Sequence, residues 1–492
     1  MGSNSFVPHG KSGNSDADPS FRPAWWTPRL AEPVIAAAVA RLTLLAVALT
    51  RVGTRALISL DTPSYLDPGR NLLFHGRYVA GGVPDLLRPP GYPLFLAITA
   101  LPGLPVAALA NAILSVFSVI LIWRLAQAIF RDDRIAIGAA WIFAFEPLTI
   151  LFSVVLLSDT LFTVFLLLGL ERVAEFLRSR RLRVIAFGGV WFAAATFARP
   201  VTYYLPFLLA AGLFFTLLRK PGIRWKAPAV LLISTLPWLA AWQVRNWVET
   251  GYGGFSNITE INLYFWDAAG ITARVTHQGY GSVRSELGDS GAVDGAVAFT
   301  GLGYLSPTYL ASHPEQSGWN QGQRLAYIHS QALQVIRTHS EIYSGACLSG
   351  LAKTLFDTDA RFFDALVDPG QPQHIADTLR DQGLIRGTIT FAKAHPWVAL
   401  EKGTLAFVML GLYVLAVRGI FRCGMRSAYL WLLLGTALYF VVTSALVVPM
   451  IADARYRLPA MPIICILASA GLGRKRTIGD NKAEVSTKQG KL

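Results

Sequence analysis

Residues 104–130 read LPVAALANAILSVFSVILIWRLAQAIF, an apolar run that holds one charged residue, Arg124. A helix that crosses a lipid bilayer needs about 20 mainly apolar residues, so this run is long enough to span a membrane. A helix that is apolar on every side belongs in lipid or in the core of a large protein. The run therefore predicts a membrane-spanning helix, and the rest of the chain shows whether it stands alone.

Apolar runs that could also span a membrane occur before and after this one along the chain. The composition agrees with them, because 53% of the residues are hydrophobic and 15% are charged, against about 25% charged in soluble domains. The sequence therefore predicts an all-α polytopic membrane protein and argues against a string of soluble domains. With residues 104–130, about ten spans are expected, the others at 32–54, 135–150, 160–178, 184–199, 202–218, 228–245, 398–417, 427–448 and 459–473.

Basic residues gather in alternate connections between these runs. Connections rich in Lys and Arg stay in the cytoplasm, so we expect both termini there, as a disordered tail at 1–30 and a basic tail at 474–492. The net charge of +14 is then a sign of membrane orientation, and we expect no nucleic-acid partner. Three cysteines lie too far apart to predict a disulfide framework or a zinc site; they are Cys347, Cys423 and Cys465.

The segments on the side of the membrane opposite the cytoplasm are called outward here, and two of them are long. The first, 57–92, follows the first span and is expected to lead into an interfacial helix at 92–101. The second, 246–395, contains a helical pattern at Arg324–Arg337 and a Gly-rich part at 277–305 that is expected to be loop. The expected organisation is a catalytic transmembrane core at 31–245, an outward segment at 246–395 and C-terminal transmembrane helices at 396–473.

Ionisable side chains recur at the outward ends of the spans. Asp61 opens the first outward loop in SLDTPSYLDPGR, and Asp159 begins the fourth span in LLSDTLF. Single residues of this kind have ordinary explanations: an arginine at a helix end often snorkels to the headgroups, and an aspartate often caps a helix. Charges are costly near lipid unless function requires them, so their convergence predicts a site. Five arginines share that membrane face: Arg88, Arg199, Arg245, Arg455 and Arg457.

This pattern suits an anionic lipid. Arginine side chains bind phosphate oxygens through paired N–H groups, and they would neutralise a phosphate as it leaves. An unpaired carboxylate in the same pocket can remove the proton of an attacking hydroxyl. We expect Asp61 and Asp159 to be ionised and to face one cavity, with Tyr65 beside Asp61.

Five short motifs extend this interpretation to a family. They are Asp61 followed by Tyr65, RPPGYPL from Arg88, Ser158–Asp159, Arg245–Asn246 and RYRLPAMP from Arg455. In their order and spacing, the chain resembles bacterial membrane glycosyltransferases of the GT-C type. The group includes the family 39 protein mannosyltransferases and the lipid A aminoarabinose and galacturonic-acid transferases.

The resemblance implies a function and roles for the residues. Such enzymes transfer one sugar, with inversion, from a polyprenyl-phosphate donor to an envelope acceptor (a lipid, a polysaccharide or a protein) at the periplasmic face of the bacterial inner membrane. Asp61 would be the catalytic base and Asp159 a second required acid. Arg88 and Arg199 would lie near the donor phosphate. The other residues expected in the site are Arg245, Arg455 and Arg457 for the phosphate and Tyr65 and Tyr92 for the substrate pocket.

The chain departs from the protein mannosyltransferases at one position. They carry two adjacent acids in the first loop, whereas Thr62 follows Asp61 here. No metal site is assigned, although a divalent cation between Asp61 and Asp159 is compatible with the sequence. Two other classes remain open, a transporter or flippase of lipid-linked sugars and a non-catalytic membrane scaffold.

Overall fold

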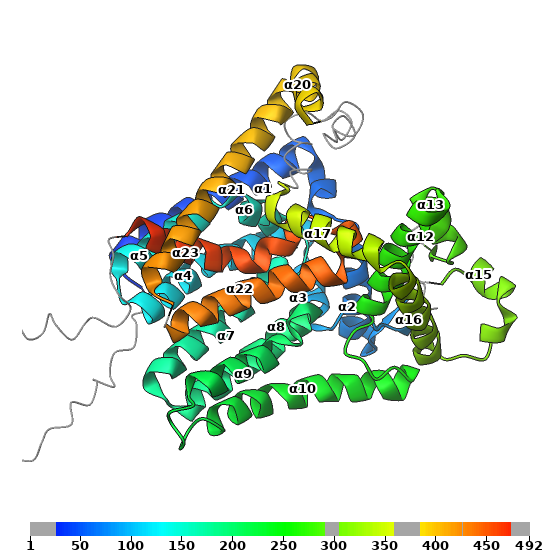
Figure 1. The fold of residues 1–492 in the computed structure, drawn as a ribbon, viewed down its shortest axis with the longest axis horizontal. Helices are drawn as coiled ribbons and strands as arrows, with labels where there is room; N and C mark the ends of the chain where they lie inside the picture. The colour runs from blue at the N-terminus through cyan, green and yellow to red at the C-terminus, as the bar shows by residue number, and fades with distance from the viewer. Residues whose placement is uncertain (1–25, 291–304, 359–383, 426, 474–492) are drawn as a thin grey trace, which may run out of the picture.

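The computed structural model describes residues 26–290, 305–358, 384–425 and 427–473. The predicted tail at 474–492, most of the tail at 1–30, and part of the Gly-rich stretch at 277–305 lie outside these residues. In the described part, helices make almost the whole fold (Figure 1). The strands β1 (Val79–Ala80) and β2 (Val83–Pro84) pair as a short antiparallel hairpin.

Thirteen of the helices, counted over the described residues, form the membrane part and the first outward loop. They are α1 (Ala31–Arg51), α2 (Thr62–His75), α3 (Gly91–Thr99), α4 (Leu104–Phe130), α5 (Asp133–Ala144), α6 (Pro147–Val154), α7 (Asp159–Ser179), α8 (Leu182–Ala198), α9 (Leu205–Thr216), α10 (Lys226–Thr250), α21 (Pro396–Cys423), α22 (Ala428–Val447) and α23 (Met461–Leu472).

The second outward segment is also mainly helical. It contains α11 (Ile258–Ile261), the π-helical η4 (Asn262–Ala268), α12 (Ala269–Thr276), α13 (Tyr280–Glu286), α15 (Pro307–Ser312), α16 (Gln321–Thr338), α17 (Ser340–Phe356) and α20 (Leu384–Ala394). Short 3-10 helices connect the larger elements: η1 (Pro28–Leu30), η2 (Gly53–Leu57), η3 (Pro200–Thr202), η5 (Pro314–Gln316), η6 (Pro449–Ile451) and η7 (Ala454–Ala460).

Each predicted span falls on a helix or a helix pair, and the predicted polytopic all-α class is confirmed. Among the described residues, five helices are long and apolar enough to cross a membrane on their own: η1 with α1, α4, α10, α21 and α22. The predicted span at 135–150 is the pair α5 and α6, bent by 55°. The other expected spans are less regular, because α8, α9 and α23 are shorter and α7 carries charged residues.

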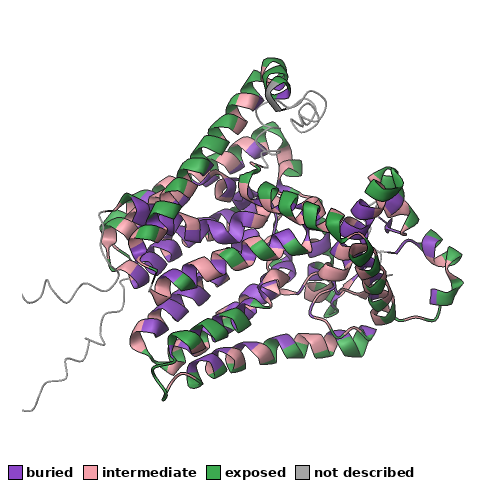
Figure 2. Ribbon diagram, viewed as in Figure 1, coloured by how far each residue is buried: buried purple, intermediate pink, exposed green. Residues whose placement is uncertain are grey.

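Buried pairing explains how charges occur on these helices. Arg124, the single charge in residues 104–130, donates to Glu171 of α7 at 2.5 Å, and both side chains are buried. A buried charge requires such a partner. The outer surface of the bundle is apolar instead. On α21, Phe407, Val414 and Phe421 are exposed, as expected for side chains in contact with lipid (Figure 2).

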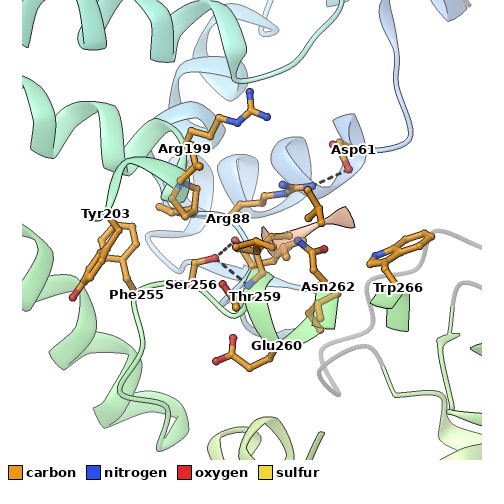
Figure 3. Close-up of a pocket in the computed structure, with 18 of the residues that line it drawn as sticks. Asp61, Arg88, Arg199, Tyr203, Phe255, Ser256, Thr259, Glu260, Asn262 and Trp266 are labelled. Atoms are coloured by element: carbon orange, nitrogen blue, oxygen red, sulfur yellow. Dashed lines mark hydrogen bonds and ion pairs between the residues drawn. The ribbon is translucent and has the colours of Figure 1, made fainter. Parts of the chain in front are cut away.

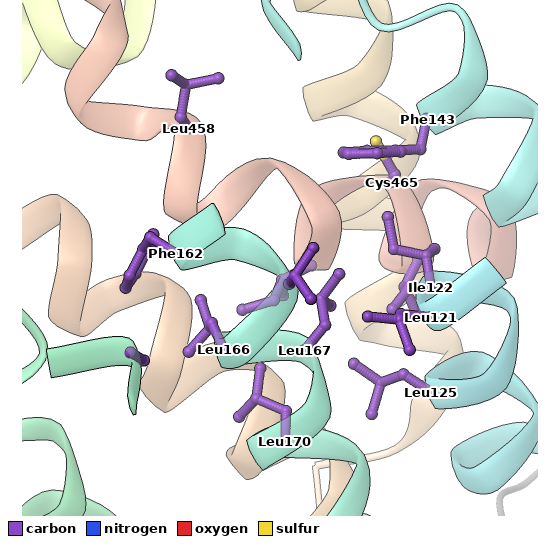
Figure 4. Close-up of a cluster of buried hydrophobic side chains, with 14 of the residues drawn as sticks. Leu121, Ile122, Leu125, Phe143, Phe162, Leu166, Leu167, Leu170, Leu458 and Cys465 are labelled. Atoms are coloured by element: carbon purple, nitrogen blue, oxygen red, sulfur yellow. The ribbon is translucent and has the colours of Figure 1, made fainter. Parts of the chain in front are cut away.

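The core lies where α4, α7 and α23 meet (Figure 4). Helix α23 also packs closely along α21, because each of the two helices has a glycine where it contacts the other. A Cβ atom on Gly419 would lie 1.9 Å from the carbonyl oxygen of Leu467, and one on Gly471 would lie 2.1 Å from that of Leu415. Small residues of this kind allow membrane helices to approach closely.

The two ends of the molecule differ. The connections α4–α5, α7–α8 and α9–α10 lie at one end of the bundle, and α12, α13, α15 and α16 lie at the other (Figure 1). The predicted interfacial helix at 92–101 corresponds to α3, and the predicted helix at Arg324–Arg337 corresponds to α16. Both are confirmed as helices, and the interfacial position of α3 stays a prediction.

The first outward loop is more ordered than its sequence indicates. Helix α2 begins directly after Asp61, with Pro63 in its first turn, and Gly76 ends it with φ +65°. Proline is favoured in the first turn of a helix and glycine just after its last residue, so these residues mark helix boundaries here. In the Gly-rich stretch, α13 occupies Tyr280–Glu286, where loop was expected.

Candidate active site

A cavity of about 720 Å³ lies between the membrane helices and the second outward segment (Figure 3). On one side it is lined by Asp61, Arg88, Arg199 and Arg455. The second outward segment contributes a surface that we call the outward wall, which consists of the cavity-lining residues within 252–266 together with Arg284, Asp289, Ser290 and His329. An apolar side is formed by α22 and by the segment that leads from η3 into α9, with Phe440, Val447, Val201 and Tyr204.

Asp61 lies at the start of α2, where two arginines hold its carboxylate. Arg88 Nη2 contacts Oδ1 at 2.9 Å, and Arg455 Nη1 donates to Oδ2 at 2.8 Å. Burial alone would raise the pKa of Asp61, but the two guanidinium groups hold that pKa well below its usual range. The expectation of an unpaired carboxylate is therefore wrong, since Asp61 is ionised and paired on both oxygens.

Asp159 is paired in the same way but lies deeper. It is the first residue of α7, its side chain is 3% exposed, and it contacts Arg199. Arg455 Nε donates to its Oδ2 at 3.0 Å. Asp159 does not line the cavity, so the expectation that both acids face it is wrong: the arginines lie between Asp159 and the open space. We call Asp61, Arg88, Asp159, Arg199 and Arg455 the ion cluster.

A threonine explains why the two acids come together. The hydroxyl of Thr62 donates to the carbonyl oxygen of Leu156 at 3.0 Å, and the backbone N–H of Leu156 donates to the carbonyl oxygen of Leu57 at 2.8 Å. These bonds tie the first loop to the turn between α6 and α7. Thr62, the residue after Asp61, therefore has a structural role.

Arg88 is fixed in place by its surroundings. Its Nε donates to Ser64 Oγ at 2.9 Å, and its guanidinium lies 4.4 Å from the centre of the Tyr65 ring. Its backbone N–H donates to Asp85, whose pKa is raised to about 6 by burial. Tyr65, as expected, lines the cavity beside Asp61.

Three predicted site residues lie away from the cavity lining. Arg245 donates to the carbonyl oxygens of Asp85 and Tyr78 at 2.9 and 2.7 Å and thereby supports the loop that carries Arg88. Arg457 donates to the carbonyl oxygens of Thr354 and Asp357. Both arginines thus bind backbone carbonyls and do not line the cavity with Arg88, Arg199 and Arg455.

Tyr92 is the third of these residues. It is fully buried, packs edge-on against Tyr65 with 5.0 Å between ring centres, and its hydroxyl accepts a hydrogen bond from Asn111. It supports the wall of the pocket without lining it.

The outward wall was not foreseen from the sequence. Tyr252 donates to Glu260 Oε2 at 3.1 Å, and burial raises the pKa of Glu260. Arg284 lies over the ring of Trp266, 3.9 Å from its centre. Figure 3 shows Glu260 and Trp266 across the cavity from Arg88. These residues lie in a loop, on short helices and on the π-helical η4, where no regular apolar spacing marks which side chains converge.

The acids of the ion cluster do not fit a divalent cation as they are arranged. Cations of that kind bind through carboxylate oxygens that are open to them, whereas arginines occupy the oxygens of Asp61 and Asp159. Within the described residues, no group of three or more His, Cys, Asp or Glu side chains is placed to hold a metal.

Searches against known proteins give several similarities. No curated protein sequence matches the chain. Among solved structures, the Archaeoglobus fulgidus oligosaccharyltransferase without ligand matches at 15% identity and a TM-score of 0.45, over 92% of this chain and 51% of the other. This chain thus spans about half the length of that protein.

Two further structures are similar. The archaeal oligosaccharyltransferase AglB from Archaeoglobus fulgidus, solved with an inhibitory peptide and a dolichol-phosphate, matches at 14% identity and a TM-score of 0.44, over 90% of this chain and 50% of the other. ArnT from Cupriavidus metallidurans, bound to undecaprenyl phosphate, matches at 14% identity and a TM-score of 0.34, over 89% and 77%.

A family model also matches the sequence directly. Residues 88–242 match the model of the dolichyl-phosphate-mannose-protein mannosyltransferases. The matched part begins at Arg88 of RPPGYPL and includes Asp159 and Arg199. This match confirms that the chain resembles the membrane glycosyltransferases of the GT-C type.

Proposed function

We propose that the chain is an inverting glycosyltransferase that moves one sugar from a polyprenyl-phosphate donor to an envelope acceptor at the periplasmic face of a bacterial inner membrane. The observation that carries the proposal is the ion cluster, in which three arginines and a cavity-facing carboxylate meet at one end of the helical bundle. The match of residues 88–242 to a glycosyltransferase family supports it.

The donor phosphate is proposed to bind at Arg88, Arg199 and Arg455. These side chains come from three separate parts of the chain and line the same side of the cavity. Charge-assisted bonds from arginine to phosphate are among the stronger hydrogen bonds in proteins. The adjoining apolar side, with Phe440, Val447 and Tyr204, suits the start of a polyprenyl tail that comes from the bilayer.

The acceptor is proposed to bind against the outward wall. That wall offers hydrogen-bonding groups and aromatic rings, including Glu260, Asn262 and Trp266. Few well-placed polar groups among apolar ones are typical of a small-molecule site. The proposed acceptor is a lipid, a polysaccharide or a protein of the envelope that presents a hydroxyl or amine.

The reaction follows from these positions. The acceptor oxygen attacks the anomeric carbon on the side away from the phosphate, its proton passes to Asp61, and the bond from the anomeric carbon to the phosphate oxygen breaks with its electrons staying on that oxygen. A single displacement of this kind inverts the anomeric centre. The arginines stabilise the negative charge that develops on the phosphate.

A transporter or flippase of lipid-linked sugars is the second class of function, and one experiment separates the two. The purified chain in detergent is given a polyprenyl-phosphate sugar and an envelope extract of a strain that lacks the chain. A transferase forms a new glycoside and releases polyprenyl phosphate without a sealed bilayer. If the donor only changes leaflet in sealed vesicles and no glycoside forms in detergent, the proposed function is wrong.

A further inference from the structure

The ion cluster has a feature that the proposed function leaves unexplained. Arg455 contacts both acids through different nitrogens, Nη1 to Asp61 and Nε to Asp159. Arg88 contacts Asp61 and Arg199 contacts Asp159. Each of the three arginines that would bind the donor phosphate therefore already contacts a carboxylate.

This pairing conflicts with the role of Asp61 as a base. A carboxylate that accepts bonds from two guanidinium groups is a weak proton acceptor, because its charged form is strongly favoured. A phosphate that enters the same side of the cavity needs the same N–H donors. The cluster must therefore rearrange before transfer can occur.

We propose that the donor phosphate displaces Asp61 from Arg88 and Arg455, so that Asp61 becomes able to accept a proton only when donor is bound. This inference rests on the proposed function. It makes Arg455 the residue that couples donor binding to the base, while Asp159 holds Arg199 and Arg455 in position throughout.

The geometry indicates which acid gives way. The side chain of Asp61 is 34% exposed and lines the cavity, whereas that of Asp159 is 3% exposed and lies behind the arginines. Arg88 is fixed by Ser64 and by the Tyr65 ring, so its guanidinium stays where the phosphate arrives. Asp61 is therefore the partner that a phosphate can replace.

The charges balance at each stage. Three arginines and two ionised aspartates give 3 − 2 = +1, and a donor phosphodiester with one negative charge brings the sum to zero. Transfer converts the diester into a monoester with about two negative charges, and the acceptor proton on Asp61 removes one. The sum stays at zero, so no uncompensated charge develops in a partly enclosed site.

Other titratable groups surround the cluster and have to be controlled. Asp85 accepts a hydrogen bond from the backbone N–H of Arg88, and Asp453 accepts one from the backbone N–H of Arg455. Tyr65 and Tyr456 line the cavity together with Asp61. Across the cavity, the remaining groups are Glu260, Arg284, Asp289 and His329.

The test measures protons taken up when a phosphate lipid binds. The full-length chain in detergent is titrated calorimetrically at about pH 7, where a phosphate monoester with a second pKa near 6 is mostly doubly charged. Buffers with different ionisation heats give the number of protons. Two ligands are compared, a short isoprenyl phosphate and its methyl diester. We expect the monoester to cause clear proton uptake and the diester to cause almost none.

Variants assign the proton. In Asp61→Asn the uptake with monoester should disappear while the ligand still binds, and in Asp61→Glu, which keeps an ionisable group, it should be retained. Arg455→Lys keeps the charge but cannot bridge both acids, so its uptake should be reduced. Arg337→Ala, an exposed position on α16, is the matched control and should behave as the parent chain.

The outcomes separate this inference from the proposed function. If Asp61→Asn takes up as many protons as the parent, another group carries the proton and the inference is wrong. It is also wrong if the parent chain binds monoester without uptake. In either case the proposed function stands when the parent chain still transfers sugar in detergent. If neither ligand binds and no sugar is transferred, the proposed function itself fails.

Discussion

The two sides of the cavity differ in how they are built. The ion cluster brings together Asp61, Arg88, Asp159, Arg199 and Arg455 from the ends of five separate segments, with ion pairs between them. Most residues of the outward wall lie within 252–266, a stretch of loop and short helices, and the others come from 284–290 and from α16. Side chains held by the membrane bundle suit a substrate that stays the same, whereas side chains on an outward segment can differ when the substrate differs. We infer that the donor is bound by the first side and the acceptor chosen by the second.

The largest effect that would sharpen this contrast is expected at Asp61. Asp61→Asn preserves shape and removes basicity, so the single-turnover rate should fall by roughly a hundred- to ten-thousandfold, the usual cost of losing a general base. Donor affinity should be equal to or higher than that of the parent chain, because the amide competes less for the arginines. Quenched-flow turnover and donor binding on the same preparation measure both. A parent-like rate would exclude Asp61 as the base.

Arginine substitutions on the same side should affect donor binding. Arg88→Ala and Arg455→Ala should each weaken donor affinity by about 1–3 kcal/mol, the range for a lost bond to a charged group. Lysine should restore affinity only in part, because it lacks the paired N–H groups. Equilibrium binding of a labelled polyprenyl phosphate measures this, and full rescue by lysine would show that these arginines only anchor the helix ends.

Arg245 provides the matched comparison for these variants. It donates to backbone carbonyls of the loop before Arg88 and lies outside the cavity lining. Arg245→Ala should therefore lower thermal stability while changing donor affinity much less than Arg88→Ala does. A larger loss of donor affinity in Arg245→Ala than in Arg88→Ala would overturn this placement.

Substitutions in the outward wall should affect the acceptor instead. Glu260→Gln and Trp266→Ala should raise the acceptor KM by about two- to tenfold, which corresponds to 0.5–1.5 kcal/mol for a neutral hydrogen bond. Donor affinity should not change, because the ion cluster lies across the cavity. Steady-state kinetics with each substrate varied in turn test the division, and an equal loss in donor binding would break it.

The smallest effect concerns pH and Asp85. Burial raises the pKa of Asp85 to about 6, above the value near 4 of an unfolded aspartate. A raised pKa means that the folded state holds its proton more strongly, so the folded state loses stability as the pH rises from about 4 to about 6. Compared with Asp85→Asn, the parent chain should become less stable over this interval. Thermal unfolding of both at several pH values measures the difference, and a constant difference would contradict it.

The sequence predicted much of the donor side and little of the acceptor side. Membrane spans follow from apolar length alone, and Asp61, Arg88, Asp159, Arg199 and Arg455 follow from the cost of charges near lipid. The pairing of Asp61 and Asp159 with the arginines could not be predicted, because it depends on the hydrogen bond from Thr62 to the turn between α6 and α7. Sequence position at a span end also did not distinguish Arg245 and Arg457 from the three arginines that line the cavity. The partners of Arg245 and Arg457 include backbone carbonyls.

The outward wall escaped prediction for a different reason. Glu260 and Trp266 lie near the π-helical η4, where the spacing of side chains differs from that of an α-helix. His329 reaches the cavity from α16, whose apolar spacing predicted the helix but not the direction of its polar face. The residues that would choose an acceptor are therefore visible only in three dimensions.

The placement of both sides on one face of the membrane can be tested independently. Reporter fusions near Gly288 and at the C-terminus should report opposite compartments if the outward segment is periplasmic and both termini are cytoplasmic. Equal compartments would contradict the topology and with it the shared site.

The most direct test of the central claim is the stereochemistry of the product. The purified chain in detergent, given a polyprenyl-phosphate sugar of known anomeric configuration and its acceptor, should yield a glycoside of the opposite configuration and one polyprenyl phosphate for each sugar transferred. Nuclear magnetic resonance of the product reads the configuration. Retained configuration would exclude a single displacement assisted by Asp61, and the absence of any glycoside would contradict the account as a whole.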